Sequence, residues 1–277
     1  MTKRRPCLVM GIVNRTPDSF YDGGRMGLDE SVKHAVDLVQ QGADLLDLGG
    51  VRAGPGPDVT EEEERDRLLP LVEALAREVG VPLSVETHRA AVAEAAIDAG
   101  AAVVNDVTGL SDPDLAGVVA ASGASLVVMH HGGQIRGRPR NPRYTDVVAD
   151  VREQLLAYAS EAIAAGVGAD RIILDAGLDF GKNTWHSLEL VRRTGELADL
   201  GYPLLVAPSR KDVVGETLDL PPDERLEGTL ALVTLSVMGG ASIVRVHDVR
   251  ATVRTVRMVE AVMGRRPPAA PVRGLWE

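Results

Sequence analysis

Short apolar runs recur along the chain, and longer segments with helical periodicity separate them. The runs are a few residues long and almost uninterrupted by polar residues, which is typical of strands buried on both faces of a parallel sheet. We therefore predict eight strands with helices between them. The predicted strands are Cys7–Val13, Asp44–Leu48, Pro82–Val85, Ala102–Asn105, Ser125–Met129, Arg171–Leu174, Pro203–Val206 and Ser242–Val246.

The segments between the strands place their apolar residues on one side of a helix. In Asp66–Val79, for example, Leu68, Val72 and Leu75 fall on one stripe. Within this segment we expect Pro70 in the first helical turn, where its missing N–H costs little. The other predicted helices are Ala90–Ala99, Val147–Ala164, Trp185–Leu200, Arg225–Met238 and Ala251–Met263.

Alternating strands and helices with short connections form either an open doubly wound sheet or a closed barrel. Eight strand–helix units in a chain of 277 residues match the (β/α)8 TIM barrel, which usually takes about 250 residues. We predict an α/β fold of this kind, as a single domain over residues 1–277. The end of the chain, rich in proline and arginine, is expected to be a flexible tail from about residue 265.

Each predicted strand delivers a polar residue at its carboxyl end, whereas the turns at the opposite end are built from glycine, valine and proline. Any one of these polar residues could be structural, for instance as a helix cap. Active sites of such barrels lie at the carboxyl ends of the strands, so the pattern predicts the site at this rim. The residues concerned are Asn14, Asp47, Glu86, Asn105, His130, Asp175, Ser209, Lys211, Arg245 and His247.

Two long loops follow strands on the same side of the predicted barrel. Arg15–Leu28 is polar and hinged by glycines, and His131–Asp146 carries several arginines among glycines and prolines. Long loops at the working face of an enzyme commonly act as lids, which is the function we expect here. The arginine-bearing loop could equally be a solvated surface excursion.

The chain has 40 acidic and 30 basic side chains, for a formal net charge of −10, and 45% of its residues are hydrophobic. This balance argues against nucleic acid as a partner, because nucleic-acid-binding proteins normally present a basic face. No apolar stretch reaches the roughly 18 residues of a membrane-spanning helix, so no membrane partner is expected. The single cysteine, Cys7, permits no internal disulfide, which favours a cytoplasmic location.

Two short motifs resemble known ligand sites but lack essential features. Gly177–Asn183 is one residue short of a P-loop and has asparagine where Ser or Thr must reach magnesium. His130 and His131 are neighbours on a strand and point to opposite faces, so they do not form a zinc pair. A magnesium ion held by substrate phosphate and one or two oxygen ligands remains compatible with the sequence.

Six ordered segments resemble the signature motifs of the dihydropteroate synthase family. The first reads Met-Gly-Ile-Val-Asn-Arg-Thr-Pro-Asp-Ser-Phe, and the six together run across residues 8–260. The matching segments are Met10–Phe20, Ala43–Gly50 with Gly54–Gly56, Asn105–Gly109, Asp175–Lys182, Ser209–Lys211 and Arg245–Val249.

The resemblance implies a (β/α)8 barrel that acts in folate biosynthesis. Enzymes of this family are transferases that join p-aminobenzoate to 6-hydroxymethyl-7,8-dihydropterin diphosphate and release pyrophosphate, with Mg2+ as the cofactor. Family members are usually homodimers, so a homodimer is expected. The partners implied are thus the pterin diphosphate and p-aminobenzoate or another acceptor.

The resemblance also implies a role for each matching residue. The pterin ring would be bound by Asp47, Glu86, Asn105, Asp175 and Lys211. The diphosphate would be held by Arg245 and His247, and by Asn14 through the magnesium ion. Phe180, Ser209 and Lys211 match positions near the p-aminobenzoate. The catalytic candidates are Lys211, Arg245 and His247.

The expected diphosphate side of the rim gathers cationic side chains, so we predict that it is locally positive although the whole chain is acidic. These side chains are Arg15, Arg52, Lys211, Arg245 and His247. A negative leaving group needs such cations where its charge grows.

The sequence departs from the family pattern at several places. The second loop usually reads Gly-Gly-Glu-Ser-Thr-Arg-Pro-Gly, and here Ala53 and Gly54 replace its threonine and arginine. Glu86 stands where the family has aspartate, and Arg15 stands where a small apolar residue is usual. Residues 175–179 read Asp-Ala-Gly-Leu-Asp in place of Asp-Pro-Gly-Ile-Gly.

These departures leave alternatives to the synthase open. A divergent paralogue could bind pterin without synthase activity or use another acceptor. Pterin-binding methyltransferase domains share the barrel, but they lack the Thr16–Phe20 segment and the Ser-Arg-Lys run at 209–211 that are present here.

Overall fold

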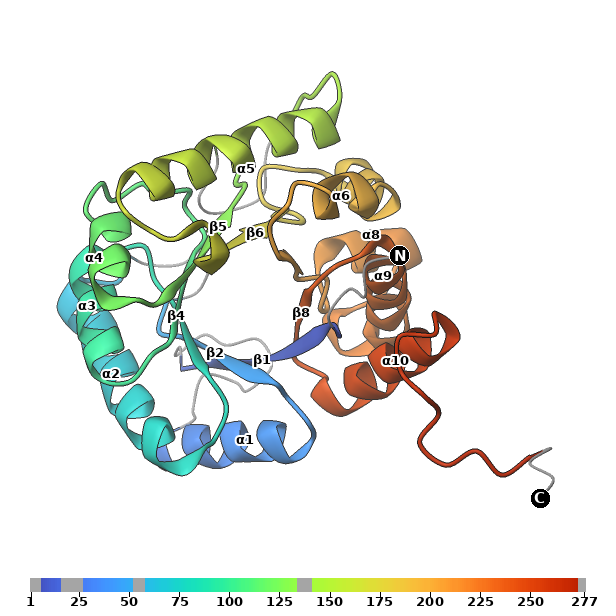
Figure 1. The fold of residues 1–277 in the computed structure, drawn as a ribbon, viewed down its shortest axis with the longest axis horizontal. Helices are drawn as coiled ribbons and strands as arrows, with labels where there is room; N and C mark the ends of the chain where they lie inside the picture. The colour runs from blue at the N-terminus through green and yellow to red at the C-terminus, as the bar shows by residue number, and fades with distance from the viewer. Residues whose placement is uncertain (1–5, 16–26, 52–57, 134–140, 274–277) are drawn as a thin grey trace.

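The eight predicted strands close into a parallel barrel in the computed structural model, which describes residues 6–15, 27–51, 58–133 and 141–273. Each strand pairs with the next along the chain, and β8 pairs with β1 (Figure 1). The predicted (β/α)8 TIM barrel is therefore confirmed. The strands are β1 Leu8–Asn14, β2 Leu45–Gly49, β3 Leu83–Glu86, β4 Val103–Asp106, β5 Ser125–Met129, β6 Ile172–Asp175, β7 Leu204–Val206 and β8 Ile243–Val246.

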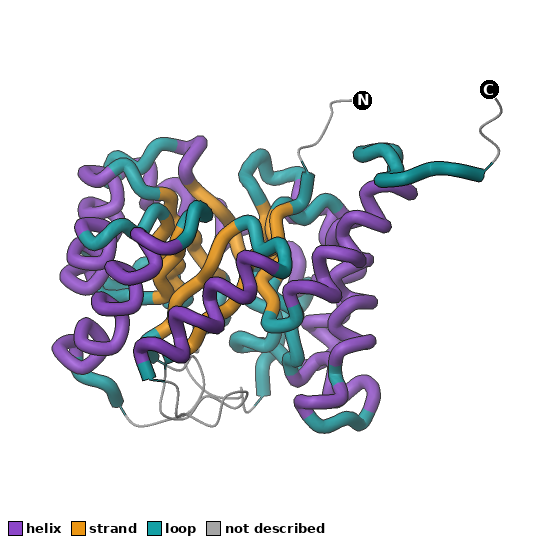
Figure 2. The backbone as a smooth tube through the Cα atoms, turned by 90° about the horizontal axis from the view of Figure 1, so that it is seen from below, coloured by secondary structure: helices purple, strands orange, loops and turns teal. Residues whose placement is uncertain are grey.

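Helices surround the barrel on the outside, as Figure 2 shows for the described residues. Most barrel strands are followed by one helix, but β6 and β7 are each followed by two. The helices are α1 Leu28–Gln40, α2 Glu61–Glu78, α3 Ala90–Asp98, α4 Leu115–Ser122, α5 Val147–Ala164, α6 Thr184–Arg192, α7 Thr194–Ala198, α8 Asp212–Leu218, α9 Leu226–Gly239 and α10 Val249–Val262, with short 3-10 helices η1 Ala169–Arg171 and η2 Pro222–Glu224.

The almost continuous apolar character of the strands follows from burial on both faces. One set of strand side chains, which includes Met10, Val127 and Leu205, fills the barrel interior. The alternate set, which includes Val9, Leu46 and Val128, packs outward in the core shared with the helices. Because successive strand side chains point to opposite faces, each strand needs apolar residues at nearly every position.

The register of the strands brings their polar ends to one level. Asn14 pairs with Gly49, Gly49 with Glu86, and Glu86 with Asn105. Met129 pairs with Asp175 farther round the barrel. The polar strand ends therefore form one rim, as the sequence pattern predicts.

Pro70 lies in the middle of α2, so its predicted place in the first turn is wrong. The helix begins earlier because Thr60 caps it, with its hydroxyl accepting a hydrogen bond from the Glu63 N–H at 3.2 Å. The first turns carry acidic residues in place of an apolar stripe, so periodicity could not detect them. Pro70 has no N–H to donate to the Asp66 carbonyl, and that carbonyl accepts a hydrogen bond from the Arg15 side chain instead.

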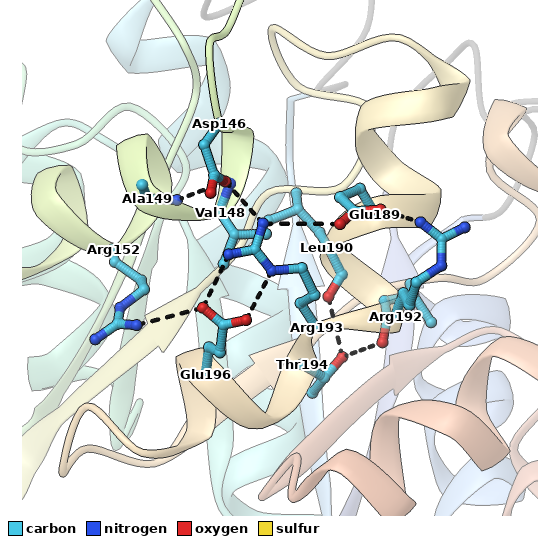
Figure 3. Close-up of polar contacts among 11 residues, drawn as sticks. Asp146, Val148, Ala149, Arg152, Glu189, Leu190, Arg192, Arg193, Thr194 and Glu196 are labelled. Atoms are coloured by element: carbon cyan, nitrogen blue, oxygen red, sulfur yellow. Dashed lines mark hydrogen bonds and ion pairs between the residues drawn. The ribbon is translucent and has the colours of Figure 1, made fainter.

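The helix predicted over Trp185–Leu200 is two helices, α6 and α7, that break at Arg193. Arg193 Nη1 donates a hydrogen bond to Oδ1 of Asp146, the N-cap of α5, at 2.9 Å. It also bonds both carboxylate oxygens of Glu196, at 2.7 and 3.0 Å. Figure 3 shows Arg193 between these two carboxylates, with Thr194 bonded back to α6 carbonyls. Helix α8 was not predicted either.

The last part of the described chain, residues 263–273, contains no helix or strand. The flexibility of the tail stays a prediction. Among the described residues, no helix combines the length and apolar character needed to cross a bilayer.

Candidate active site

A fully buried carboxylate, Asp47, lies at the centre of the barrel mouth. Its Oδ1 accepts a hydrogen bond from the Ser84 hydroxyl at 2.6 Å. Its Oδ2 accepts bonds from the Asn105 amide at 3.1 Å and from Arg245 Nε at 2.6 Å. These partners come from β3, β4 and β8, so one side chain on β2 links four strands of the barrel.

Arg245 also bonds a second carboxylate across the mouth. Its Nη2 donates to Glu86 Oε2 at 2.6 Å, while its Nε is bonded to Asp47. A guanidinium held by two carboxylates has a fixed plane and orientation. The structure therefore brings together three residues that the sequence predicts for the site, and it pairs them.

Burial raises the pKa of Glu86 to about 7, with Arg245 opposing and Asp47 adding to the rise. Three carboxyls, those of Asp47, Glu86 and Asp175, lie in this part of the mouth. The basic side chains that oppose their charge are Arg245, Lys211 and Lys182. Because burial disfavours the charged carboxylate, the Glu86 carboxyl holds a proton near neutral pH.

Asn105 carries an unused hydrogen-bond acceptor. Its amide nitrogen donates to Asp47, but its Oδ1 is buried and has no partner among the described residues. A buried polar atom without a partner is costly, and a ligand donor would remove that cost. The hydrogen bond to Asp47 thus fixes the orientation of Asn105 and leaves its Oδ1 as an acceptor for a ligand at the mouth.

Asp175 and Lys211 form the opposite wall. Asp175 accepts the Gly177 N–H at 2.8 Å, and burial raises the pKa of its carboxyl, with Lys211 opposing. Lys211 donates to the Leu178 carbonyl at 2.7 Å, and its ammonium lies 4.9 Å from the centre of the Phe180 ring. Burial lowers the pKa of Lys211, with Asp175 opposing. Three predicted site residues, Asp175, Phe180 and Lys211, therefore lie together.

Ser209 and His247 are bonded to each other. The His247 N–H donates to Ser209 Oγ at 3.1 Å, and the same oxygen lies 3.0 Å from His247 Nδ1. The hydroxyl and the imidazole ring are therefore hydrogen-bonded to each other. Burial and the neighbouring Arg245 lower the pKa of His247 to about 4. The ring is neutral at physiological pH, so the sequence prediction of a cation at this position is wrong.

Asn14 ends β1 and is half-buried at the rim. Its Oδ1 lies so close to Gly49 that a Cβ at residue 49 would collide with it. Within the described residues, no group of three or more His, Cys, Asp or Glu could hold a metal ion. An amide oxygen beside a diphosphate fits magnesium, which takes few protein ligands and keeps waters and substrate oxygens.

Arg15 points away from the predicted diphosphate region. Its Nη1 donates to the carbonyls of Asp66 at 3.3 Å and Arg67 at 2.7 Å, in the middle of α2. Asp66 is the residue whose carbonyl Pro70 leaves without an amide donor. Arg15 therefore repairs the break in the α2 hydrogen-bond ladder, which the sequence could not reveal because the two segments are far apart in the chain.

Several predicted features lie outside the described residues. These are Arg52, Ala53 and Gly54 in the second loop, most of the first loop, and residues 134–140 of the arginine-bearing loop. The lid function of both loops stays a prediction.

Lys182 and His130 are buried polar residues whose partnership the sequence did not predict. Lys182 Nζ lies 2.8 Å from His130 Nδ1. This contact joins the segment that resembles a P-loop to the pair of neighbouring histidines. A cavity of about 510 Å³ lies next to His130, lined also by Tyr144, Asp150 and Gly181. The available signal in the sequence was a lysine directly after the glycine-bearing segment 177–181.

Comparisons with known proteins agree with this site. Residues 10–247 match the family model described as pterin binding enzyme. The chain is 48% identical over 275 residues to the protein named inactive dihydropteroate synthase 2 of Mycobacterium tuberculosis, covering 97% of this chain and 86% of that protein. It is 41% identical over 268 residues to dihydropteroate synthase of Bacillus subtilis, covering 96% and 92%.

Among solved structures, dihydropteroate synthase of Yersinia pestis in complex with a sulfonamide drug superposes with a TM-score of 0.90. The two chains are 40% identical, and the match covers 94% of this chain and 95% of the other. The chain therefore belongs to the pterin-binding enzymes and, among them, to the dihydropteroate synthase family.

The Arg15 contact predicts a coupling with Pro70. Arg15→Ala should lower the free energy of unfolding by about 1 kcal/mol, because the Asp66 carbonyl loses its donor and the Arg67 carbonyl loses a hydrogen bond. In a Pro70→Ala background the same change should cost less, since the restored N–H can bond the Asp66 carbonyl. Urea denaturation of the four proteins measures this coupling. An equal cost in both backgrounds would contradict it.

The raised pKa of Glu86 predicts a pH-dependent stability. The folded carboxyl binds its proton more tightly than the unfolded one, whose pKa is 4.5, so its contribution is complete below about pH 4.5 and is lost as the pH rises to about 7. Relative to Glu86→Gln, the wild type should lose up to about 3 kcal/mol across this window.

Urea denaturation at pH 4.5 and pH 8 measures this difference. The exposed Glu153→Gln on α5 is the matched control and should retain the wild-type pH dependence. The same pH dependence in Glu86→Gln and wild type would show that Glu86 is not the titrating group.

Proposed function

We propose that this protein binds a dihydropterin at the mouth of its barrel and is a transferase of the dihydropteroate synthase type. It condenses 6-hydroxymethyl-7,8-dihydropterin diphosphate with p-aminobenzoate and releases pyrophosphate. The observation that carries the proposal is the buried set of Asp47, Asn105, Glu86 and Arg245 opposite Asp175 and Lys211.

The pterin ring suits this set because its edges carry both hydrogen-bond donors and acceptors. Donors on the heterocycle meet the free Asn105 Oδ1 and the Asp175 carboxylate, whereas acceptors on it meet Lys211. Glu86, with a pKa of about 7, can donate or accept according to its protonation state. A few fixed polar groups in a narrow slot are what orients a flat ligand.

The diphosphate is assigned to the side of the mouth that contains Arg245 and His247. Arg245 uses Nε and Nη2 on carboxylates, and its Nη1 has no bond to a described residue, so Nη1 can donate to a phosphate oxygen. His247 contributes a neutral imidazole ring to this side. Asn14 would hold a magnesium ion, which would supply positive charge where the leaving group becomes more negative.

The acceptor amine is assigned to the wall formed by Phe180, Ser209 and Lys211. The C–O bond to the diphosphate breaks, and the amine nitrogen forms a C–N bond to the same methylene carbon and then loses a proton. Such a reaction depends mainly on positioning the amine and stabilising the leaving group, because the neutral arylamine is already the nucleophile. Lys211 over the Phe180 ring supplies a flat, positively charged wall for an aromatic carboxylate.

A second candidate function is pterin binding without synthase activity. Three observations favour it. Arg245 is bonded to two carboxylates, which lowers its net positive potential toward a diphosphate. Residues 53 and 54 also lack the threonine and arginine of the family pattern. Several similar proteins carry the name inactive dihydropteroate synthase 2.

One assay separates the two functions. The purified protein is incubated with the dihydropterin diphosphate, Mg2+ and p-aminobenzoate, and dihydropteroate is quantified. Product formation supports the transferase. No product, together with pterin binding in a calorimeter, supports the second function. No product and no pterin binding would refute both.

Substitution of the opposite wall tests where the pterin binds. Lys211→Ala and Asp175→Ala should each weaken pterin affinity by about tenfold or more, because each removes a buried partner of the ring. Calorimetric titration with 6-hydroxymethyl-7,8-dihydropterin measures the change, with the exposed Lys33→Ala as control. Unchanged affinity in both variants would mean that the pterin binds elsewhere.

We also propose that the protein is a cytoplasmic homodimer. Leu235 and Met238 on α9, and Met258 and Val262 on α10, expose 52%, 55%, 65% and 75% of their surface. The two helices are neighbours (Figure 1). The four residues lie in the C-terminal halves of these helices. Clustered exposed apolar side chains favour contact with a second copy. The lone cysteine supports a reducing compartment.

A further inference from the structure

Lys182 is a buried lysine that no role in the proposed reaction accounts for. Its side chain is 2% exposed, and its ammonium lies among four acceptors. Three are carbonyl oxygens, of Phe180 at 2.8 Å, Gly177 at 2.9 Å and His130 at 3.2 Å. The fourth is His130 Nδ1 at 2.8 Å. Burial lowers the pKa of Lys182 to about 7, and these hydrogen bonds replace the water that the buried amino group has lost.

The contacts of Lys182 continue outward to α5. Burial and the adjacent Lys182 lower the pKa of His130 to about 4, so its ring is neutral. A neutral ring that accepts from Lys182 at Nδ1 carries its hydrogen on Nε2, which lies 3.1 Å from Asp150 Oδ1. The Asp150 side chain is 54% exposed and lines the 510 Å³ cavity. Lys182 is thereby connected to Asp150 on α5 through His130, which directly follows β5.

The loop that Lys182 holds turns through three residues in the left-handed region, and only Asp179 among them has a steric cost there. Gly177, Asp179 and Gly181 have φ values of +64°, +69° and +60°, in the left-handed region. A Cβ on Gly177 would overlap the His130 carbonyl, and one on Gly181 would overlap that of His131. The loop therefore lies directly against the end of β5, and the bonds from Lys182 hold it there.

The same loop presents two groups to the ligand site. The Leu178 carbonyl accepts from Lys211, and the Phe180 ring lies beneath the Lys211 ammonium. Lys182 bonds the Gly177 carbonyl, which directly precedes Leu178, and the carbonyl of Phe180 itself. Its hydrogen bonds thus determine where Lys211 and Phe180 stand.

We propose that Lys182 is a positioning residue, which through Gly177, Phe180 and His130 fixes the loop that sets Phe180 and Lys211 at the ligand site. The proposal rests on the proposed pterin-binding function for its ligand. Lys182 itself touches no reacting atom. A merely structural lysine would affect stability without changing the surroundings of Phe180 or the affinity for pterin.

The chain has two phenylalanines, Phe20 and Phe180, so 4-fluorophenylalanine labelling gives two 19F resonances. Phe20→Leu assigns them. Lys182→Met keeps the length of the side chain but removes its charge, and Lys33→Met makes the same change on the exposed face of α1. Far-UV circular dichroism reports folding, and calorimetry reports affinity for 6-hydroxymethyl-7,8-dihydropterin.

In folded Lys182→Met we expect the Phe180 resonance to shift or split and pterin affinity to fall by about tenfold, with no change in Lys33→Met. An unmoved Phe180 resonance, or wild-type affinity, would overturn the proposal. If Lys182→Met does not fold, Asp150→Asn at the exposed end of the contact chain decides. It should shift the Phe180 resonance in the folded protein, and an unmoved resonance would overturn the proposal.

The two proposals fail in different ways. If the wild type binds no pterin, the proposed function fails, and the 19F resonance of Phe180 alone then decides whether Lys182 positions the loop. If the wild type binds pterin but Lys182→Met behaves as the wild type, the proposed function stands and the role of Lys182 is refuted.

Discussion

The ion pair between Asp47 and Arg245 is the interaction on which the rest of the mouth depends. Asp47 is fully buried, and an ionised carboxylate in that position must be paired and hydrogen-bonded to be tolerated. Ser84, Asn105 and Arg245 meet that requirement from three other strands. Their orientation then follows from Asp47. Asn105 is turned so that its oxygen is free, and Arg245 is turned so that it reaches Glu86.

The electrostatics of the mouth differ from those of the whole chain, but not as the sequence suggested. A locally positive rim was expected within a chain of net charge −10. In the structure His247 is neutral, Arg15 is bonded to α2, and Arg245 is paired with carboxylates. A proton on Glu86 removes one of the negative charges of the mouth. Any excess of positive charge for a diphosphate must then come from Arg245 Nη1, Lys211 and a metal ion.

The sequence predicted the barrel well because its signals are local. Each strand is buried on both faces, so an apolar run marks it, and each polar strand end lies at one rim because parallel strands share their direction. The misplaced Pro70 and the divided helix at Arg193 have another origin. Arg193 is bonded to Asp146, and the Asp66 carbonyl to Arg15, through contacts between distant segments. The site residues were recognised by motif, whereas Lys182 depends on a ring of carbonyls that only the folded loop creates.

The most direct measurement is the affinity of folded Asp47→Asn for 6-hydroxymethyl-7,8-dihydropterin, determined by calorimetry. The substitution retains the shape of the side chain but removes the charge that holds Arg245 and turns Asn105. Asp44→Asn is the control, because Asp44 caps the opposite end of the same strand, where it accepts the Val9 N–H at 2.8 Å. We expect wild-type affinity in Asp44→Asn and a loss of about tenfold or more in Asp47→Asn. Wild-type affinity in a folded Asp47→Asn protein would contradict the central place given to this ion pair.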